Sequence, residues 1–188
     1  MENLLSQEGK VVLITGGSRG LGHSMSLAFA AHGADVAIVS RKVENCESTA
    51  AEVRALGREA FAYGVHVGNW DQLGEMVDAV YERFGRVDVL INNAGMSPLY
   101  PSLHEVSEEL FDKVVSVNLK GPFRLSALVA SRMAEGNGGS IINVSSTASV
   151  NPSPGSEPYG AAKAGLNAIT RSFAYAYGPK VRVNCIMA

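Results

Sequence analysis

The sequence is poor in the features that mark several large classes of protein. Two of its 188 residues are cysteines, too few for the disulfide framework of a small secreted domain. No apolar run reaches the roughly 18 residues that a membrane span requires. The N-terminus also lacks the basic and then apolar order of a signal peptide. We therefore expect a cytoplasmic protein with no membrane partner.

The sequence also has no strong excess of positive or negative charge and no metal-binding pattern. The formal net charge is −2 and the pI is about 6.1, so no electrostatic feature favours nucleic acid or an anionic membrane as a partner. The four histidines are His23, His32, His66 and His104. They show no metal-ligand spacing, and we expect no metal site. Cys46 falls on a predicted helix and Cys185 at a strand end, so both are interpreted as inert thiols.

What is present is a strict alternation of two patterns. Short apolar, β-branched runs predict strands, and segments with apolar residues at helical spacing lie between them. The predicted strands are 10–15, 34–40, 60–65, 87–91, 140–144 and 181–185. The predicted helices follow Gly22 and then occupy 44–56, 71–84, 107–133 and 159–177. The alternation predicts a single α/β domain over residues 1–188, with a doubly wound parallel sheet and ligands at the carboxyl ends of its strands.

The first strand runs into a glycine-rich turn that opens the first helix. Its residues are Thr15, Gly16, Gly17, Ser18, Arg19, Gly20, Leu21 and Gly22. Glycines let the backbone approach a pyrophosphate, and a helix N-terminus adds N–H donors and a favourable dipole. The spacing is G-x-x-x-G-x-G and not the G-x-G-x-x-G of many dehydrogenases. A purely structural turn is the alternative, but the position between a strand and a helix favours dinucleotide binding.

The end of the second strand indicates which dinucleotide binds. An acidic residue at this place holds the ribose 2′-hydroxyl of NAD, whereas an arginine accommodates the 2′-phosphate of NADP. Here the residues are Ser40 and Arg41, and Arg19 lies within the glycine turn. Two guanidinium groups without a carboxylate favour NADP, with NAD the weaker candidate. The alternative is that both arginines are ordinary solvated charges.

The segment from Ser145 to Lys163 carries the candidate chemistry. Tyr159 and Lys163 are four residues apart on a predicted helix, so their side chains project from one face. A cation one turn away favours the phenolate, which makes the tyrosine a usable acid and base. Ser145 and Ser146 end the preceding strand, where a hydroxyl can hydrogen-bond the same substrate oxygen. This device suits interconversion of a carbonyl and an alcohol, although Tyr-x-x-x-Lys alone also fits an ordinary half-exposed pair.

Five motifs together give a more specific signal. They are the glycine turn from Thr15, Asn92-Asn93-Ala94-Gly95, Asn118 in V-N-L-K-G, Ser146, and Tyr159-x-x-x-Lys163. In this order and at these separations they closely resemble the short-chain dehydrogenase/reductase family, over essentially the whole chain. The resemblance implies a Rossmann fold, hydride transfer at the nicotinamide C4 atom, and a homodimer or homotetramer built through helices 107–133 and 159–177.

The resemblance also implies a catalytic tetrad of Asn118, Ser146, Tyr159 and Lys163. Tyr159 would be the acid and base, and Ser146 would hold the carbonyl oxygen. Ser146 is preferred to Ser145 because it lies thirteen residues before Tyr159, as is usual in the family. Lys163 would also bind the nicotinamide ribose, and Asn118 would connect Lys163 to a water chain. The expected cofactor contacts are Thr15, Gly16, Ser18, Arg19, Gly20, Leu21, Gly22, Ser40, Arg41, His66, Val67, Asn92, Ala94, Gly95, Tyr159 and Lys163.

Two features depart from the family pattern. His66-Val67 follows the third strand where the family commonly has Asp-Val, so an imidazole replaces the carboxylate that contacts the adenine amino group. The chain also ends at Ala188, just after the sixth predicted strand, which would leave a sheet edge uncovered. We therefore expect a missing C-terminal part that would carry most substrate-specificity residues. The residues expected to border the substrate pocket are Ser97, Leu99, Pro152 and Ser153.

These observations predict an NADP-dependent oxidoreductase that interconverts a ketone and a secondary alcohol. Candidate substrates are 3-oxoacyl thioesters, sugar-derived ketones, steroids and xenobiotic carbonyls, and nothing in the sequence selects among them. A non-catalytic dinucleotide-binding regulator, or an inactive truncated form, is the alternative. The mark of a regulator would be a degraded tetrad beside an intact glycine turn. A dehydratase or epimerase would more often carry G-x-x-G-x-x-G.

Overall fold

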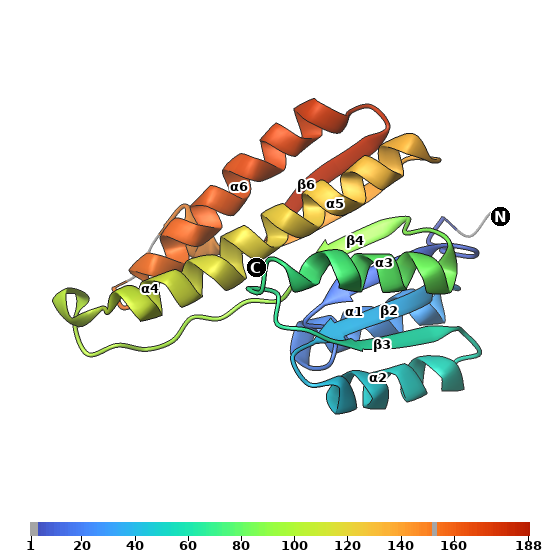
Figure 1. The fold of residues 1–188 in the computed structure, drawn as a ribbon, viewed down its shortest axis with the longest axis horizontal. Coiled ribbons are helices and arrows are strands. Elements are labelled where there is room, and N and C mark those ends of the chain that lie inside the picture. Colours follow the sequence, from blue (N-terminus) through green and yellow to red (C-terminus); the bar gives the residue numbers. More distant parts are fainter. Residues whose placement is uncertain (1–3, 152–153) are drawn as a thin grey trace.

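Parallel strands and helices alternate through the chain as the apolar patterns predict. The computed structural model describes residues 4–151 and 154–188. In these residues six parallel strands form one sheet in the order β3-β2-β1-β4-β5-β6 (Figure 1). The strands are β1 (Val11–Thr15), β2 (Asp35–Ser40), β3 (Ala60–Gly64), β4 (Val89–Asn92), β5 (Gly139–Ser145) and β6 (Val181–Met187). The predicted doubly wound fold is confirmed.

The helices cover both faces of the sheet. They are α1 (Gly20–Ala31), α2 (Val43–Ala55), α3 (Gln72–Phe84), α4 (Glu108–Val115), α5 (Gly121–Glu135) and α6 (Glu157–Tyr177). Three shorter turns accompany them, η1 (Leu103–Glu105), η2 (Ser116–Lys120) and η3 (Thr147–Ser149). On one face α1 and α2 pack over Val12 and Ile14, while on the other α3, α5 and α6 pack over Leu13. Burial on both sides explains why the strands are apolar throughout.

The strand order reverses between β1 and β4. The chain leaves β1 through α1 on one face, and it reaches α5 on the other face after β4. The two connections therefore diverge and leave a crevice at the carboxyl ends of these neighbouring strands. This is the place where a doubly wound sheet binds its ligand, and the candidate site residues are found around it.

The helix predicted over 107–133 is present from Glu108 to Glu135, with one π-helical turn inside it that was not predicted. Ser107 is the N-cap of α4, as expected, and its Oγ accepts the N–H of Leu110 at 3.2 Å. The π-helical turn η2 then separates α4 from α5. Pro122 lies in the first turn of α5 and has no N–H to continue the regular α-helical hydrogen bonds through η2. The interruption matters because Asn118 lies within η2.

Of three other element boundaries, the end of α3 agrees with the prediction and the starts of β4 and α6 differ from it. Helix α3 ends at Gly85 with a φ of 74°, the left-handed C-terminal residue that was predicted. Strand β4 begins at Val89 and not at 87, and just before its start the carboxylate of Asp88 accepts the N–H of Val11 over 2.9 Å. Helix α6 begins at Glu157, two residues before the predicted start.

Within residues 4–151 and 154–188 no helix combines the length and apolarity of a membrane span.

Candidate active site

The turn between β1 and α1 brings the first helix against the end of the strand. Gly16 has a φ of 65°, in the left-handed region that favours glycine. Gly22 lies so close to this turn that a Cβ atom there would be 2.1 Å from the carbonyl oxygen of Gly16. The helix can begin against the turn only because position 22 has no side chain.

The N-terminus of α1 is open to an anion. Arg19 precedes the helix in an extended conformation and makes no capping hydrogen bond through its side chain. The first turn contains no acidic residue. The N–H groups of this turn and the positive end of the helix dipole therefore face the β1–α1 turn. This arrangement fits the pyrophosphate of a dinucleotide.

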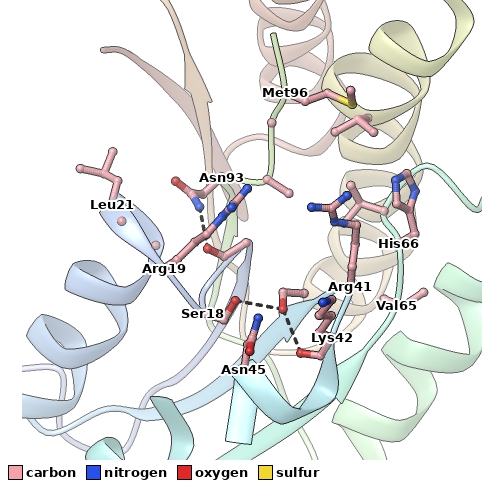
Figure 2. Close-up of a pocket in the computed structure, with 18 residues that line it drawn as sticks. Ser18, Arg19, Leu21, Arg41, Lys42, Asn45, Val65, His66, Asn93 and Met96 are labelled. Carbon is pink, nitrogen blue, oxygen red and sulfur yellow. Dashed lines mark hydrogen bonds between the residues drawn. The ribbon is translucent and has the colours of Figure 1, made fainter. Parts of the chain in front are cut away.

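A cleft of about 630 Å³ lies at the carboxyl ends of the central strands (Figure 2). Its volume is typical of a small-molecule site. The predicted cofactor contacts that line it are Gly16, Ser18, Arg19, Gly20, Leu21, Gly22, Ser40, Arg41, His66, Val67, Ala94 and Gly95. Asn93 of the Asn92–Gly95 motif also lines it, and the lining residues that the sequence did not indicate are Lys42, Asn45, Val65, Met96 and Val117. The structure thus brings the ends of four strands, β1, β2, β3 and β4, together around one cavity.

The cleft is positive where it meets the end of β2. Arg19, Arg41 and Lys42 line it, and none of its described lining residues carries a carboxylate. Figure 2 shows the side chains of Arg19 and Arg41 extending from two different turns toward the same part of the cleft. Three cations without an acid suit a phosphate group, for which arginine offers bidentate hydrogen bonds.

Two serine hydroxyls lie behind these cations and are connected to a buried thiol. Ser18 Oγ donates to Ser40 Oγ over 3.0 Å, and Ser40 Oγ lies 3.0 Å from Cys46 Sγ on α2. Burial raises the pKa of the Cys46 thiol above its ordinary value, so the thiol stays neutral. Cys46 therefore holds Ser40 from within the core, which gives this cysteine a role that its sequence position did not indicate.

His66 borders the cleft beside Arg41 (Figure 2). The backbone N–H of Gly68 donates to His66 Nδ1 over 3.1 Å. Burial, and then the charges of Arg41 and Lys113, hold the pKa of His66 below its usual value. The imidazole is therefore neutral with its proton on Nε2. It presents a hydrogen-bond donor where an aspartate would present an acceptor.

Two expected cofactor contacts lie behind the cleft and support its wall. Thr15 is buried, and its Oγ1 accepts the N–H groups of Asn93 and Ala94, each at 3.1 Å. Asn92 is also buried, and its amide donates to Asn143 Oδ1 on β5 over 2.8 Å. The neighbouring Asn93 lines the cleft instead and donates to the carbonyl of Thr15 over 2.9 Å. Asn92 therefore supports the strands from behind, and Asn93 forms part of the cleft wall.

Lys163 and Tyr159 lie together on the first turns of α6. Lys163 is 3% exposed, and its Nζ donates to the carbonyl oxygen of Val144 over 2.7 Å. The same atom lies 5.6 Å from the centre of the Tyr159 ring. Burial lowers the pKa of Lys163 to about 8. The spacing of four residues therefore places a desolvated ammonium group against the phenol ring.

Asn118 is fully buried within the π-helical turn η2. Its Nδ2 donates to the carbonyl oxygens of Val114 and Met96, over 2.9 and 2.8 Å. Its Oδ1 accepts the N–H of Met96 at 3.2 Å. The interruption of the helix thus directs this amide at the loop that follows β4, which is a common use of a π turn at a functional site.

The two serines at the end of β5 have different surroundings. Ser145 is buried, and its Oγ donates to the carbonyl oxygen of Lys163 over 3.4 Å. Ser146 is partly exposed, and its Oγ accepts the N–H of Ala148 at 3.3 Å. That bond uses the Ser146 oxygen as an acceptor and leaves its proton for a substrate oxygen. Of the pair, Ser146 is the one that can meet a substrate.

The cleft and these side chains meet at Gly95. This glycine lines the cleft, and a Cβ atom built on it would lie 3.0 Å from Asn118 Oδ1 and 3.7 Å from Lys163 Nζ. A side chain at this position would fill the junction. The expected cofactor contacts Tyr159 and Lys163 do not themselves line the cleft, but Gly95 brings its wall next to Lys163 and Asn118.

This combination of fold and site is found in known proteins. The short chain dehydrogenase family matches residues 10–188. The chain belongs to this family. The 3-oxoacyl-(acyl-carrier-protein) reductase FabG of Thermotoga maritima is 39% identical over 180 residues, which are 95% of this chain and 73% of the relative. The predicted family membership is confirmed.

Solved structures of short-chain dehydrogenases superimpose closely on the chain. A metagenomic short-chain oxidoreductase in complex with NADP gives a TM-score of 0.92 at 34% identity, over 96% of this chain and 82% of that chain. An NAD⁺-bound xylitol dehydrogenase also gives 0.92, at 32% identity, over 96% of this chain and 70% of that chain. The chain spans 64 to 73% of the length of the curated relatives it matches.

Among residues 4–151 and 154–188, no three His, Cys, Asp or Glu side chains are placed to hold a metal ion. Of the residues expected at the substrate pocket, Ser97 and Leu99 are exposed on the loop after β4, with Leu99 92% exposed. Pro152 and Ser153 fall outside the described residues.

The missed cleft residues of this short-chain dehydrogenase differ in how far the sequence signalled them. Lys42 extends the basic pair begun at Arg41, and Asn45 falls on the first turns of the helix that follows. Both were within reach of the same reasoning that selected Arg41. Val65, Met96 and Val117 are apolar residues that the fold brings to the cleft from three separate elements. No local pattern distinguishes them from core residues.

Proposed function

We propose that the chain carries the cofactor and catalytic site of an NADP-dependent oxidoreductase that interconverts a ketone and a secondary alcohol. The observation that carries this proposal is the junction at Gly95. There the wall of the cation-lined cleft lies next to the buried amide of Asn118 and to the ammonium group of Lys163, which is 5.6 Å from the centre of the Tyr159 ring. The confirmed family, whose relatives include reductases and dehydrogenases, supports the same reaction class.

The cofactor fits the cleft by the chemistry of its walls. The uncapped N-terminus of α1 and the glycine cradle at Gly16 and Gly22 would hold the pyrophosphate. Arg19, Arg41 and Lys42 would hold a 2′-phosphate. NADPH, when bound, supplies the hydride that reduces the carbonyl carbon. Related structures hold NADP in one case and NAD in another, so the preference for NADP rests on these cations and on the absence of a carboxylate from the described lining.

The protein residues handle the oxygen of the substrate. In the proposed reaction Ser146 donates its hydroxyl proton in a hydrogen bond to the carbonyl oxygen and polarises it. As negative charge develops on that oxygen, the Tyr159 phenol transfers its proton to it and becomes a phenolate. The ammonium group of Lys163 stabilises the phenolate, and the buried Asn118 fixes the loop that lines the junction. The alcohol leaves with the hydride on carbon and the proton on oxygen, and the reverse sequence oxidises an alcohol.

A panel of ketones with NADPH and NADH tests the proposal. Oxidation of NADPH that depends on both a ketone and Tyr159 would support it. Tight binding of NADPH with no turnover, on this chain and on longer natural forms alike, would support the alternative of a non-catalytic regulator. The complete set of Asn118, Ser146, Tyr159 and Lys163 side chains argues against that alternative. The substrates to include are 3-oxoacyl thioesters, sugar-derived ketones, steroids and xenobiotic carbonyls.

We further propose a homodimer or homotetramer that works in the cytoplasm. The helices α4, α5 and α6 each leave an aromatic side chain exposed, namely Phe111, Phe123 and Tyr175, and Tyr175 is 89% exposed. These are the helices through which the resemblance to the family predicts the interface. Both cysteines are free thiols, which agrees with a reducing compartment. Light scattering on the purified chain measures the oligomer, and a monomer at all concentrations would contradict the first part.

A further inference from the structure

One contact on the substrate side of the site has no part in the mechanism above. Glu157 is the first residue of α6, two residues before Tyr159. The hydroxyl of Tyr100 donates to the Glu157 carboxylate, and the backbone N–H of Glu157 donates to that hydroxyl over 3.0 Å. Tyr100 comes from the loop after β4, 57 residues earlier in the chain. We call this pair the Tyr100–Glu157 clasp.

The clasp does the work of a helix cap. The N-terminal N–H groups of a helix have no partner within the helix. Ser156 precedes α6 without a capping hydrogen bond from its side chain, and Pro158 has no N–H. The hydroxyl of Tyr100 takes the Glu157 N–H instead, and the Glu157 carboxylate accepts the N–H of Gly155 at 3.1 Å. The start of the helix that carries Tyr159 is therefore defined by a side chain from a distant loop.

The same loop is attached to the tetrad at a second point. Met96 is bound on both sides by the amide of Asn118, over 2.8 and 3.2 Å. Figure 1 shows the loop running from the end of β4 to the start of α4, beside the N-terminal end of α6. Its two attachments therefore end on Asn118 and on the first turn of α6. The stretch between the two attachments, residues 97–99, is therefore held at both of its ends.

A solvated surface pair would not give this arrangement. Exposed pairs pay side-chain entropy and are screened, so they order little around them. Tyr100 and Glu157 are both half-buried, and the clasp makes three hydrogen bonds that include two backbone N–H groups. Ser102 and Glu105 form a hydroxyl–carboxylate bond within the same loop, but it is exposed and joins residues only three apart. That local pair provides a matched control.

We propose that Tyr100 and Glu157 are positioning residues for the reaction: the clasp fastens the loop after β4 to the first turn of α6 and holds Tyr159 at the distance that proton transfer requires. This inference rests on the proposed function, because it concerns the acid and base of that reaction. A displacement of about 1 Å can cost on the order of 100-fold in rate, so a small loosening of this turn has a measurable effect.

The clasp keeps one protonation state over the range in which such an enzyme is assayed. Its hydrogen bond from Tyr100 holds the pKa of Glu157 below the usual value. Burial, and then the carboxylate, raise the pKa of Tyr100. The phenol stays protonated and the carboxylate ionised across neutral and mildly alkaline pH. The clasp is therefore a permanent fastening and not a pH switch.

The first experiment measures chemistry in Tyr100→Phe, Glu157→Ala and the double variant. We expect each single change to lower kcat about tenfold, with the KM for a ketone changed less, and the double variant to match the singles. With NADPH deuterated at C4, the isotope effect on kcat should rise because hydride and proton transfer become limiting. Glu157→Gln, which keeps an acceptor for the Tyr100 hydroxyl, should recover most of the rate. Tyr175→Phe on α6 and Ser102→Ala should leave the rate and the isotope effect unchanged.

A merely structural role gives a different pattern. Partial unfolding would lower the fraction of active enzyme and therefore the apparent kcat. The isotope effect would then stay unchanged, and Glu157→Gln would lose as much activity as Glu157→Ala. That result would overturn the proposal. Equal losses in Tyr100→Phe and Tyr175→Phe would do so as well.

Amide hydrogen exchange tests the clasp without turnover. In Tyr100→Phe, exchange should accelerate together in residues 93–106 and in the first turn of α6, with and without NADPH, and remain unchanged in Tyr175→Phe. Unchanged exchange in both segments would overturn the clasp even if the enzyme is active. A chain that shows coupled exchange but reduces no ketone would instead reject the proposed function and leave the fastening established.

Discussion

The two halves of the site are built in different ways. The cofactor half, at the ends of β1 and β2, consists of backbone held open by glycine and of cations that line an accessible cleft. The proposed catalytic half, where β5, η2 and α6 meet, combines two buried polar side chains, Asn118 and Lys163, with the partly exposed Ser146 and Tyr159. Asn118 and Lys163 are withdrawn from solvent and bound to the carbonyl oxygens of Met96 and Val144. One half is an accessible surface, and the other is anchored in the core by two buried side chains.

This difference separates the effects that substitutions should have. A lining cation can be removed without disturbing the core, so its loss should appear in cofactor affinity. A buried polar side chain is tied to backbone groups, so its loss should appear in the rate and in stability. The four changes below test this division, in order of decreasing effect.

Tyr159→Phe should have the largest effect and should be confined to catalysis. Removing the phenol hydroxyl removes the proposed acid and base, a contribution of about 10²- to 10⁴-fold in rate. The affinity for NADPH should stay within a few-fold, because the cleft is unchanged. Steady-state kinetics and a fluorescence titration measure the two quantities. Retained turnover would show that another group transfers the proton.

Lys163→Met should separate catalysis from stability through pH. Burial lowers the pKa of folded Lys163 from 10.5 to about 8, so the unfolded chain binds more protons between these values. The contribution of Lys163 to stability is therefore unfavourable below pH 8 and improves as pH rises toward 10.5. The free energy of unfolding of the wild type relative to Lys163→Met should increase across this window, by at most about 3 kcal/mol.

Chemical denaturation at several pH values measures that difference. Lys180→Met, at an exposed lysine, controls for the loss of any lysine. A wild-type advantage that falls as pH rises from 8 to 10.5 would mean that burial does not disfavour the ammonium form. In either case Lys163→Met should lose most of its activity, because the phenolate loses its neighbouring cation.

Arg41→Asp combined with Ser40→Asp should change the cofactor preference. The carboxylates would repel a 2′-phosphate and accept hydrogen bonds from a 2′-hydroxyl. We expect NADPH affinity to fall about 10- to 100-fold, as for the loss of charge-assisted hydrogen bonds, and NADH affinity to stay level or improve. Calorimetric titration of both cofactors measures the ratio. Equal losses for both would contradict the assignment of a phosphate site at the end of β2.

Cys46→Ala should give the smallest effect, and like the change at Arg41 and Ser40 it should lower NADPH affinity relative to NADH affinity. Its thiol holds Ser40, which in turn accepts the hydroxyl of Ser18, so its removal loosens the wall behind the cations. We expect NADPH affinity to fall about two- to fivefold, with NADH affinity nearly unchanged. Cys46→Ser is the control, since a hydroxyl can still bond Ser40. Equal weakening for the two cofactors would assign Cys46 to core packing alone.

The fold was largely predictable because its signals are local. Apolar runs bounded by glycine gave the six strands of the described chain, and Ser107 and Gly85 marked helix ends that the structure confirms. The helix predicted over 107–133 is present as α4, η2 and α5, but the π turn around Asn118 was not predicted. Apolar spacing does not report which hydrogen-bond pattern closes a helical turn.

The site residues that belong to one sequence motif were predictable from their spacing. The contacts that the fold makes between distant segments were less predictable. Tyr159 and Lys163 share a face because four residues separate them, and no other element is needed. Which of Asn92 and Asn93 lines the cleft depends on how a strand end meets its neighbours. The Tyr100–Glu157 clasp joins residues 57 positions apart and has no local signal at all.

The most direct test of the account is the fate of the hydride. NADPH deuterated at the transferred position of C4 is mixed with a ketone that the chain reduces, and the alcohol is analysed by mass spectrometry. If the cleft and the Tyr159–Lys163 cluster form one site through Gly95, the alcohol carries deuterium on its carbinol carbon and a solvent proton on its oxygen. An alcohol without deuterium on that carbon would mean that hydride does not pass directly between cofactor and substrate, and would contradict the account.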